Sequence, residues 1–278
     1  MVLRNIESYP PQEPFTEIGG EYHLRVQELG ADVAGSSFAY GDDPYQEVAV
    51  FPASKPDGRV VVFMHGGGWT NGYKEWMAFM APALNAIGIT FVSLGYRLAP
   101  AVQWPDGVLD AAAGVAWVYA NIADHGGDPD RLIVGGHSAG GHYATWLAVR
   151  DDWQARLKVP ADVIKGAVPV SGVYDFTEGN GMPGRPRFLG EAESNDLDAS
   201  PILSIRNTPP VLMSWGDHDF PHLITQAERM TVALGDAKAS VETLVLENCD
   251  HLGASYACGE TSAPWVRALD QWSRDCQI

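Results

Sequence analysis

One stretch of the chain, RLIVGGHSAGGHYATWLAV, constrains the fold more than any other. It joins an apolar run typical of a buried strand to an apolar helical pattern, and the junction is GHSAG at 136–140. Glycines permit the close backbone approach that so sharp a turn requires. The turn would expose the Ser138 hydroxyl beside the first N–H groups of the helix, whose positive dipole end suits a developing oxyanion. A glycine turn with an incidental serine fits the pentapeptide equally well, so the rest of the chain decides.

Strand-like and helix-like segments alternate from Glu47 onward, which predicts an α/β fold with a mostly parallel sheet covered by helices on both faces. We expect one domain over residues 1–278. Residues 1–45 are polar and rich in proline, and are predicted to form an N-terminal arm or cap. Residues 174–209 show no clear period and are predicted to be an inserted loop or partial lid. The expected strands are 47–52, 59–65, 89–96, 131–136, 163–172, 209–215 and 241–247, and the expected helices are 75–88, 105–122, 139–151, 224–235 and 262–275.

The charge and composition narrow the classes of partner. The net charge of -17 argues against nucleic acid and anionic membranes, because both require basic patches. We see no secretory signal and no apolar stretch near the roughly 18 residues of a membrane span, so we expect a cytoplasmic protein. The three cysteines form no C-x-x-C pair, which indicates neither a disulfide framework nor a zinc ribbon. The sequence does not decide whether the chain forms a homo-oligomer.

A second glycine run, HGGGW at 65–69, follows the apolar strand VVVFM directly. Such a loop can turn its N–H groups towards a cleft, and this pattern forms half of the oxyanion hole in lipases and esterases. Gly67 and Gly68 are the predicted donors, with the N–H of Ala139 as their partner. No G-x-x-x-x-G-K-[ST] or dinucleotide-binding pattern accompanies either glycine run, which disfavours a phosphate site.

The acid and the base of such a site should follow later strands, in the order Ser, Asp or Glu, His. His251 follows the last expected strand and is the predicted base, carried on a mobile loop. The acid is Asp219 or Asp217, both in GDHDF after PPVLMSW, and we favour Asp219. Asp250 is expected to face solvent.

Other side chains near these motifs suggest different interpretations. His137 and His142 flank Ser138 in sequence and are expected to support the turn rather than take part in chemistry. The cluster of Asp217, His218, Asp219 and His222 contains metal-ligand types, but an acidic catalytic loop explains it at least as well, so no metal is predicted. Three tryptophans near expected strand ends indicate an aromatic-lined pocket, although ordinary packing is an alternative for each; they are Trp69, Trp104 and Trp215.

With these motifs in place, the chain resembles a known group. HGGGW, GYRLAPAVQWP and GGDPDRLIVGGHSAGGH are similar to the hormone-sensitive-lipase-like branch of the α/β-hydrolase esterases. AWVYANIADHGGDPDRL, GHSAGGHYATWLA and VSGVYDF resemble bacterial kynurenine formamidases (arylformamidases) more closely still. The resemblance runs from about Val60 to the end and is strongest as far as Arg150. It implies a Ser138–His251–Asp219 triad, an oxyanion hole from Gly67, Gly68 and Ala139, and no cofactor.

The expected activity is therefore that of a serine hydrolase acting on small carboxylic esters or activated aryl formamides through an acyl-enzyme on Ser138. Formamidases often have a tyrosine where Gly68 stands, whereas three glycines resemble the esterases, so the substrate stays open between the two. The alternative from another class is a catalytically silent module that binds a small molecule, because some proteins of this fold lose the histidine. The order Ser, Asp, His in this chain argues against that alternative.

Overall fold

A single eight-stranded sheet crosses the protein in the computed structural model, which describes residues 3–177, 179–181 and 186–278. The strand order is β1-β2-β4-β3-β5-β6-β7-β8. The first two pairings, β1 with β2 and β2 with β4, are antiparallel, and all the others are parallel. The predicted mostly parallel sheet is thus confirmed. The strands are β1 (Ser36–Ala39), β2 (Glu47–Phe51), β3 (Gly58–Met64), β4 (Thr90–Leu94), β5 (Gly127–His137), β6 (Gly166–Val170), β7 (Val211–Gly216) and β8 (Val241–Leu246).

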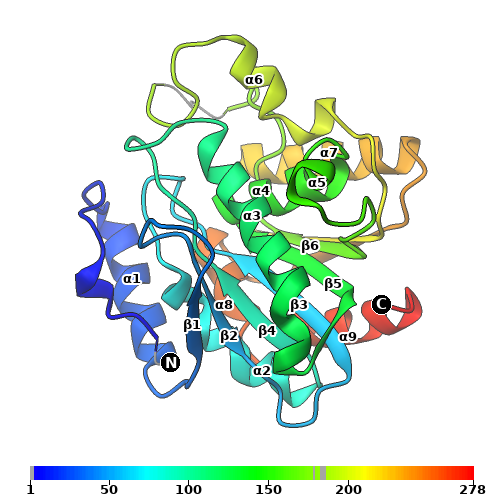
Figure 1. The fold of residues 1–278 in the computed structure, drawn as a ribbon. Helices are drawn as coiled ribbons and strands as arrows, with labels where there is room; N and C mark the ends of the chain where they lie inside the picture. Colours follow the sequence, from blue (N-terminus) through cyan, green and yellow to red (C-terminus); the bar gives the residue numbers. More distant parts are fainter. Residues whose placement is uncertain (1–2, 178, 182–185) are drawn as a thin grey trace.

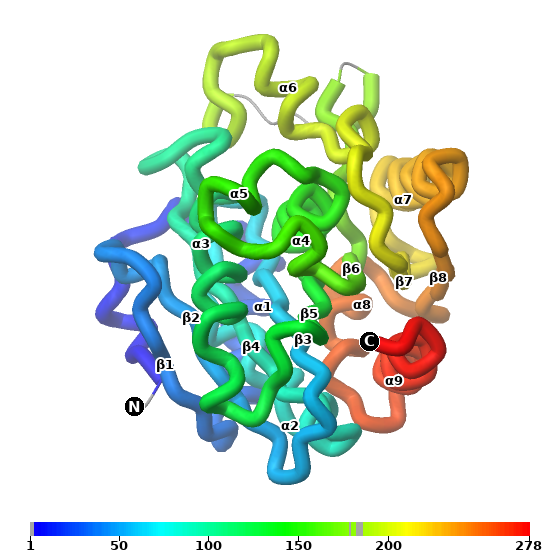
Figure 2. Tube along the Cα trace, turned by 45° about the vertical axis from the view of Figure 1, so that its right-hand side comes forward, coloured from blue at the N-terminus to red at the C-terminus, as the bar shows by residue number. Residues whose placement is uncertain are grey.

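Helices cover both faces of this sheet (Figures 1 and 2). Successive residues of a strand point to opposite faces, so Val60 and Val62 join one apolar core while Val61 and Phe63 join the other. The first core packs against α3 (Asp106–Asn121), α4 (Ala139–Val149) and α7 (Pro221–Asp236). The second packs against α1 (Glu17–Gly30), the 3₁₀ helix η2 (Lys74–Met80), α2 (Ala81–Ala86), α8 (His251–Ala257) and α9 (Pro264–Asp275). Shorter helices are η1 (Ile6–Ser8), η3 (Ile122–His125), α5 (Gln154–Leu157), α6 (Ser194–Asp198) and η4 (Pro201–Leu203).

The N-terminal segment is tied to the sheet by buried polar contacts. Lys74 is 1% exposed, and its ammonium group contacts Glu47 at 2.9 Å and donates to the Tyr9 hydroxyl at 2.7 Å. Within the predicted arm, α1 packs against η2, and β1 extends the sheet by pairing with β2, a strand that the sequence pattern did not indicate. Burial of a charged amine is tolerated only when it is paired, so these contacts hold the arm in place.

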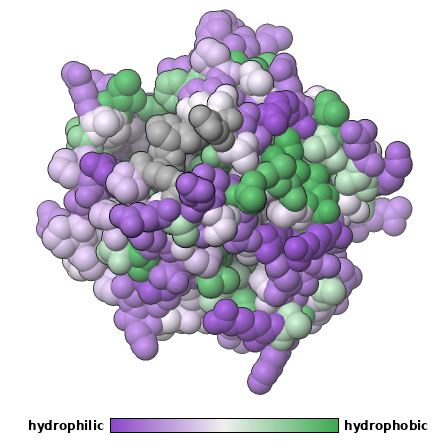
Figure 3. Space-filling model, turned by 90° about the horizontal axis from the view of Figure 1, so that it is seen from above, coloured by the Kyte–Doolittle hydropathy of each residue, from purple (hydrophilic) through white to green (hydrophobic). Residues whose placement is uncertain are grey.

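The described part of the predicted lid, residues 174–209, contains α6 and η4 and lies at the top of the view in Figure 1. Residues 178 and 182–185 of that stretch lie outside the described residues. The surface seen from above in Figure 3 is mostly hydrophilic, with one larger apolar patch and a few small ones. Among the described residues, no helix has the length and apolar character needed to cross a membrane.

The topology gathers the predicted site residues at one edge. Parallel strands end at the same edge of a sheet, where open α/β folds bind their ligands. Register pairs Met64 at the end of β3 with Gly136 near the end of β5, and Gly216 at the end of β7 with Leu246 at the end of β8. The segments that follow these four strands carry the glycine loop, the predicted nucleophile, the predicted acid and the predicted base.

Candidate active site

Ser138 stands on a strained turn between β5 and α4. Its backbone has φ 54° and ψ -115°, a conformation that costs a non-glycine residue about 1–3 kcal/mol. Its N–H donates to the carbonyl of Val170 at the end of β6. A Cβ on Gly136 would lie 2.2 Å from the carbonyl carbon of Gly140, and one on Gly140 would lie 2.1 Å from the Met64 oxygen. The two glycines are therefore required by backbone contact, and they hold the serine in its strained conformation.

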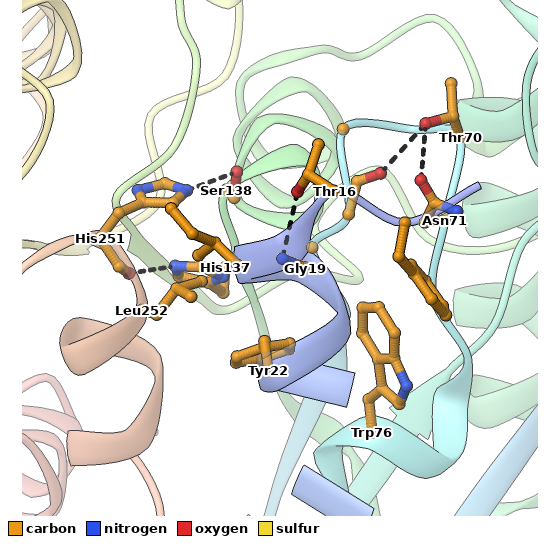
Figure 4. A pocket seen from close by; sticks show the side chains of 15 residues that line it. Thr16, Gly19, Tyr22, Thr70, Asn71, Trp76, His137, Ser138, His251 and Leu252 are labelled. Atoms are coloured by element: carbon orange, nitrogen blue, oxygen red, sulfur yellow. Dashed lines mark hydrogen bonds between the residues drawn. The ribbon is translucent and has the colours of Figure 1, made fainter. Parts of the chain in front are cut away.

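The imidazole of His251 contacts both other residues of the predicted triad. Its Nε2 lies 2.9 Å from the Ser138 Oγ, and its Nδ1 lies 2.8 Å from an Asp219 carboxylate oxygen. In the neutral ring, Nδ1–H donates to the carboxylate and Nε2 accepts from the serine hydroxyl. Figure 4 shows the His251 ring pointing at Ser138. The predicted mobile loop is wrong, because His251 is the first residue of α8.

Of the two candidate acids, only Asp219 reaches the imidazole. It is 4% exposed, and it also accepts from the N–H of Phe220 at 2.7 Å. Burial raises the pKa of Asp219, but the hydrogen bond and charge of His251 outweigh it, so the net pKa lies below the usual range. Asp217 is exposed and accepts from the Cys249 N–H at 3.1 Å. Asp250, expected only to face solvent, is exposed and caps α8 by accepting from the Gly253 N–H at 2.7 Å.

The glycine loop after β3 folds into a tight turn beside Ser138. Gly67, Gly68 and Trp69 all have positive φ, at 111°, 60° and 63°. The Gly67 carbonyl accepts from the N–H groups of Thr70 and Asn71 at 3.2 and 3.0 Å. The structure thus places Gly67 and Gly68 on the wall of a cavity that also contains Ser138, while Ala139 opens α4 directly after the serine. Their roles as oxyanion donors stay a prediction.

The side chains of His65, the first residue of HGGGW, and of Tyr96, whose role the sequence analysis did not predict, support this loop. The ring of His65 stacks on Tyr96 with centroids 4.3 Å apart, and the Tyr96 hydroxyl donates to the His65 carbonyl at 2.7 Å. Both side chains are fully buried. GYRLAP was noted only as part of a resemblance, and no local pattern indicates that its tyrosine packs on the histidine of HGGGW.

Two cavities flank the contacts of the predicted triad and share Gly68, Ser138 and His251. The α1-side cavity, about 320 Å³, is walled by α1 and η2, with the rings of Tyr22 and Trp76 at one side (Figure 4). The lid-side cavity, about 270 Å³, is lined by residues of the segment after β6 and of α7, together with Trp69. Of the three tryptophans predicted to line a pocket, Trp69 lines the lid-side cavity.

Trp104 and Trp215 line neither of these cavities. Trp104 is 6% exposed, donates to Asp198 at 2.9 Å and packs edge-on against Trp146. Trp215 lies within β7, where it is 6% exposed, so it is part of the core. Proximity to a strand end in the sequence did not distinguish a side chain facing the cleft from one packed under it.

Comparison with known proteins agrees with this geometry. A family model described as the α/β-hydrolase fold matches residues 61–254, which is most of the chain. The chain belongs to the α/β-hydrolase family.

Relatives of this α/β-hydrolase family member include named esterases. It is 32% identical over 253 residues to Esterase LipC of Mycobacterium tuberculosis, covering 83% of this chain and 62% of LipC. It is 30% identical over 239 residues to isoprenylcysteine alpha-carbonyl methylesterase ICME of Arabidopsis thaliana, covering 77% of this chain and 56% of ICME. The chain thus spans under two thirds of the length of these relatives.

Solved structures support the fold independently. The thermophilic carboxylesterase EstE1, cloned from a metagenomic library, superposes with a TM-score of 0.71 at 22% identity, covering 94% of this chain and 96% of EstE1. An arylesterase superposes with a TM-score of 0.72 at 19% identity, covering 91% and 90%. At these identities the likeness concerns the fold, and it confirms the predicted α/β-hydrolase architecture.

His137 contacts the predicted base, His251, in this α/β-hydrolase family member. Its Nε2 lies 2.8 Å from the His251 carbonyl, to which it donates, and the two rings are 4.6 Å apart. Burial and the nearby charge of His251 lower the pKa of His137 to about 3, so the ring is neutral. In the described parts of the chain, no three His, Cys, Asp or Glu residues are grouped so as to hold a metal ion.

The two loop glycines should respond differently to alanine. A Cβ on Gly67 would lie 2.0 Å from the Asn71 carbonyl oxygen, whereas one on Gly68 meets nothing within 4 Å. We expect Gly67→Ala to distort the turn and lower kcat/KM for an ester by about 10²- to 10³-fold, the effect of losing one oxyanion donor. Gly68→Ala keeps its N–H, and its cost is that of an alanine in the left-handed backbone conformation, about 1–2 kcal/mol. We therefore expect a smaller loss of kcat/KM. Equal losses in steady-state kinetics would contradict this difference.

Proposed function

We propose that this protein is a carboxylesterase that cleaves small, uncharged carboxylic esters through an acyl-enzyme on Ser138. The observation that carries the proposal is the continuous contact from Ser138 Oγ through His251 to Asp219, at a point where two cavities meet. Relatives named as esterases in two organisms support the same reaction class.

The proposed reaction has two halves. His251 Nε2 takes the hydroxyl proton as Ser138 Oγ attacks the ester carbonyl, and the oxygen becomes an oxyanion facing Gly67, Gly68 and Ala139. When the tetrahedral intermediate collapses, the protonated imidazole gives that proton to the departing alkoxide, which leaves as the alcohol. Water then attacks the acyl-enzyme with His251 as base, releasing the acid and restoring the serine hydroxyl. Asp219, ionised at neutral pH, stabilises the imidazolium in both halves.

The cavities favour a neutral ester with an apolar group on each side of the carbonyl. Among their lining residues in the described part of the chain, neither cavity has a Lys, Arg, Asp or Glu. Several polar groups of the α1-side cavity are already paired: the Tyr22 hydroxyl contacts Ser255 at 2.8 Å, and the Trp76 N–H donates to His23 at 2.9 Å. A charged substrate group would therefore lose its hydration without gaining a partner.

An aryl formamide is the second candidate substrate, and one contact favours it. Because His137 Nε2 donates to the His251 carbonyl, its Nδ1 is a lone-pair acceptor, and no described residue hydrogen-bonds to it. His137 lines the α1-side cavity next to Ser138. An anilide N–H beside the scissile carbonyl would supply the missing donor, which an ester lacks.

The test is labelling of the purified protein with an alkyl fluorophosphonate, followed by a substrate panel. We expect one adduct, on Ser138, and turnover of p-nitrophenyl acetate and butyrate. An intact protein that gives no adduct and no turnover would be the silent binding module and would end the proposal. Higher kcat/KM for N-formylkynurenine than for every ester would replace the ester by the formamide as substrate.

A further inference from the structure

A second histidine near Ser138 hydrogen-bonds to other protein groups through both of its ring nitrogens. His142 lies one helical turn after Ser138 in α4, and it is fully buried. Its Nδ1 is 3.2 Å from the indole nitrogen of Trp69, and its Nε2 is 2.7 Å from the carbonyl of Ala199. An indole N–H can only donate and a carbonyl can only accept, so Nδ1 carries the lone pair and Nε2 the hydrogen. The tautomer is determined by these two partners.

The two partners belong to different parts of the site. Trp69 follows Gly68 in the glycine loop, and Ala199 belongs to the predicted lid stretch 174–209, just before η4. The Trp69 ring also stacks on Phe188 of that stretch, with centroids 4.2 Å apart and planes at 7°. His142 therefore joins the nucleophile helix, the glycine loop and the lid stretch through buried contacts.

The backbone at Trp69 needs such an anchor. Gly68 and Trp69 have φ of 60° and 63°, and a bulky residue rarely adopts this left-handed conformation. Backbone strain of this kind persists only where surrounding contacts hold it. The buried contacts of the indole ring include its hydrogen bond to His142, its stacking on Phe188 and a tilted contact with Phe176. Release of the indole would let the loop relax and rotate the N–H groups of Gly67 and Gly68.

We propose that His142 is a positioning residue of the oxyanion hole: through its hydrogen bond with Trp69 it keeps the Gly67–Gly68 backbone aligned with the start of α4. The inference rests on the proposed function for its kinetic readout. His142 is not among the lining residues of either cavity at Ser138, so it acts through Trp69 and not on the substrate.

Two substitutions test the hydrogen bonds of the two His142 ring nitrogens one at a time. In His142→Asn, the side-chain oxygen takes the place of Nδ1 and still accepts from Trp69, while the donor to Ala199 is lost. In His142→Gln, the amide nitrogen takes the place of Nε2 and still donates to Ala199, while the acceptor for Trp69 is lost. Each variant leaves one buried group unpaired, so both should lower the melting temperature by similar amounts.

The kinetic outcomes should differ. We expect His142→Gln to lower kcat for a p-nitrophenyl ester by about 10- to 100-fold with little change in KM, because a small displacement of catalytic groups has effects of this size. His142→Asn should stay within about threefold of wild type, since the loop anchor is kept. A trifluoromethyl ketone, which forms an oxyanion on Ser138, should bind His142→Gln more weakly by the factor lost in kcat/KM. In the double variant with Trp69→Phe, the His142→Gln substitution should have no further effect.

A readout without activity completes the test. Amide hydrogen exchange of the peptide containing residues 65–72 should be faster in His142→Gln than in His142→Asn, and segments that contain neither Trp69 nor Ala199 should exchange alike in the two variants. Equal kinetic losses and equal loop exchange in the two variants would overturn the proposal and leave His142 a packing residue. If the wild type hydrolysed no ester at all, the proposed function would fail, and loop exchange would still decide the role of His142.

Discussion

Replacing Ser138 with alanine should lower kcat for the best ester substrate by about 10⁶-fold, to the level that binding and oxyanion contacts alone provide. The reason is that Ser138 Oγ, which lies 2.9 Å from His251 Nε2, is the only protein nucleophile in the proposed mechanism, and without it no acyl-enzyme forms. Because alanine also has a Cβ, the strained turn is no worse than with serine, and the fold should be retained. The measurement is steady-state hydrolysis with the enzyme at high concentration, together with the melting temperature.

A matched control is Ser240→Ala, which removes an exposed hydroxyl just before β8, at the opposite end of that strand from His251. It should keep wild-type kinetics. The Ser138→Ala variant should also lose its fluorophosphonate adduct, while it retains the affinity for substrate that the two cavities provide. Wild-type turnover by folded Ser138→Ala would show that another group attacks the ester.

The turn at Ser138 and the glycine loop could be predicted because each depends on consecutive residues. The strand–turn–helix around Ser138 follows from an apolar run, a glycine-flanked serine and a helical pattern, and the clashes at Gly136 and Gly140 show why glycines stand there. The sheet edge could be predicted because parallel strands share one end. These features need no knowledge of which side chains meet across the fold.

The surroundings of the site depend on contacts between distant segments, and the sequence pattern indicates them poorly. His251 was expected on a mobile loop because the helix that begins with it has only seven residues, and the cap of that helix, Asp250, resembles any loop aspartate. The α1 wall of one cavity comes from a segment more than a hundred residues before Ser138. The same limit applies to His142, whose two partners lie 73 and 57 residues away in the chain.

Asp219→Asn and Asp217→Asn should separate the two candidate acids. The carboxylate of Asp219 holds the His251 Nδ1–H at 2.8 Å, and this hydrogen bond selects the tautomer in which Nε2 can take the serine proton. An asparagine amide could instead donate to Nδ1, which would place the ring hydrogen on Nε2 and block proton transfer. We therefore expect Asp219→Asn to lower kcat by about 10⁴-fold with the fold intact.

Asp217→Asn is the control for that result, because Asp217 is exposed and its role is to accept from the Cys249 N–H, which an asparagine oxygen also does. Its kcat/KM should remain within about twofold of wild type, as is usual for surface substitutions. Steady-state kinetics at neutral pH on both variants decide the assignment, since the lowered pKa of Asp219 keeps the wild-type carboxylate ionised there.

A large loss of kcat in Asp217→Asn with full activity in Asp219→Asn would transfer the acid role to Asp217. That would require the loop after β7 to move so that Asp217, now on the solvent side, turns towards His251. The contacts of Asp219 with Phe220 and His251 oppose such a movement, and they are the reason to expect the first outcome.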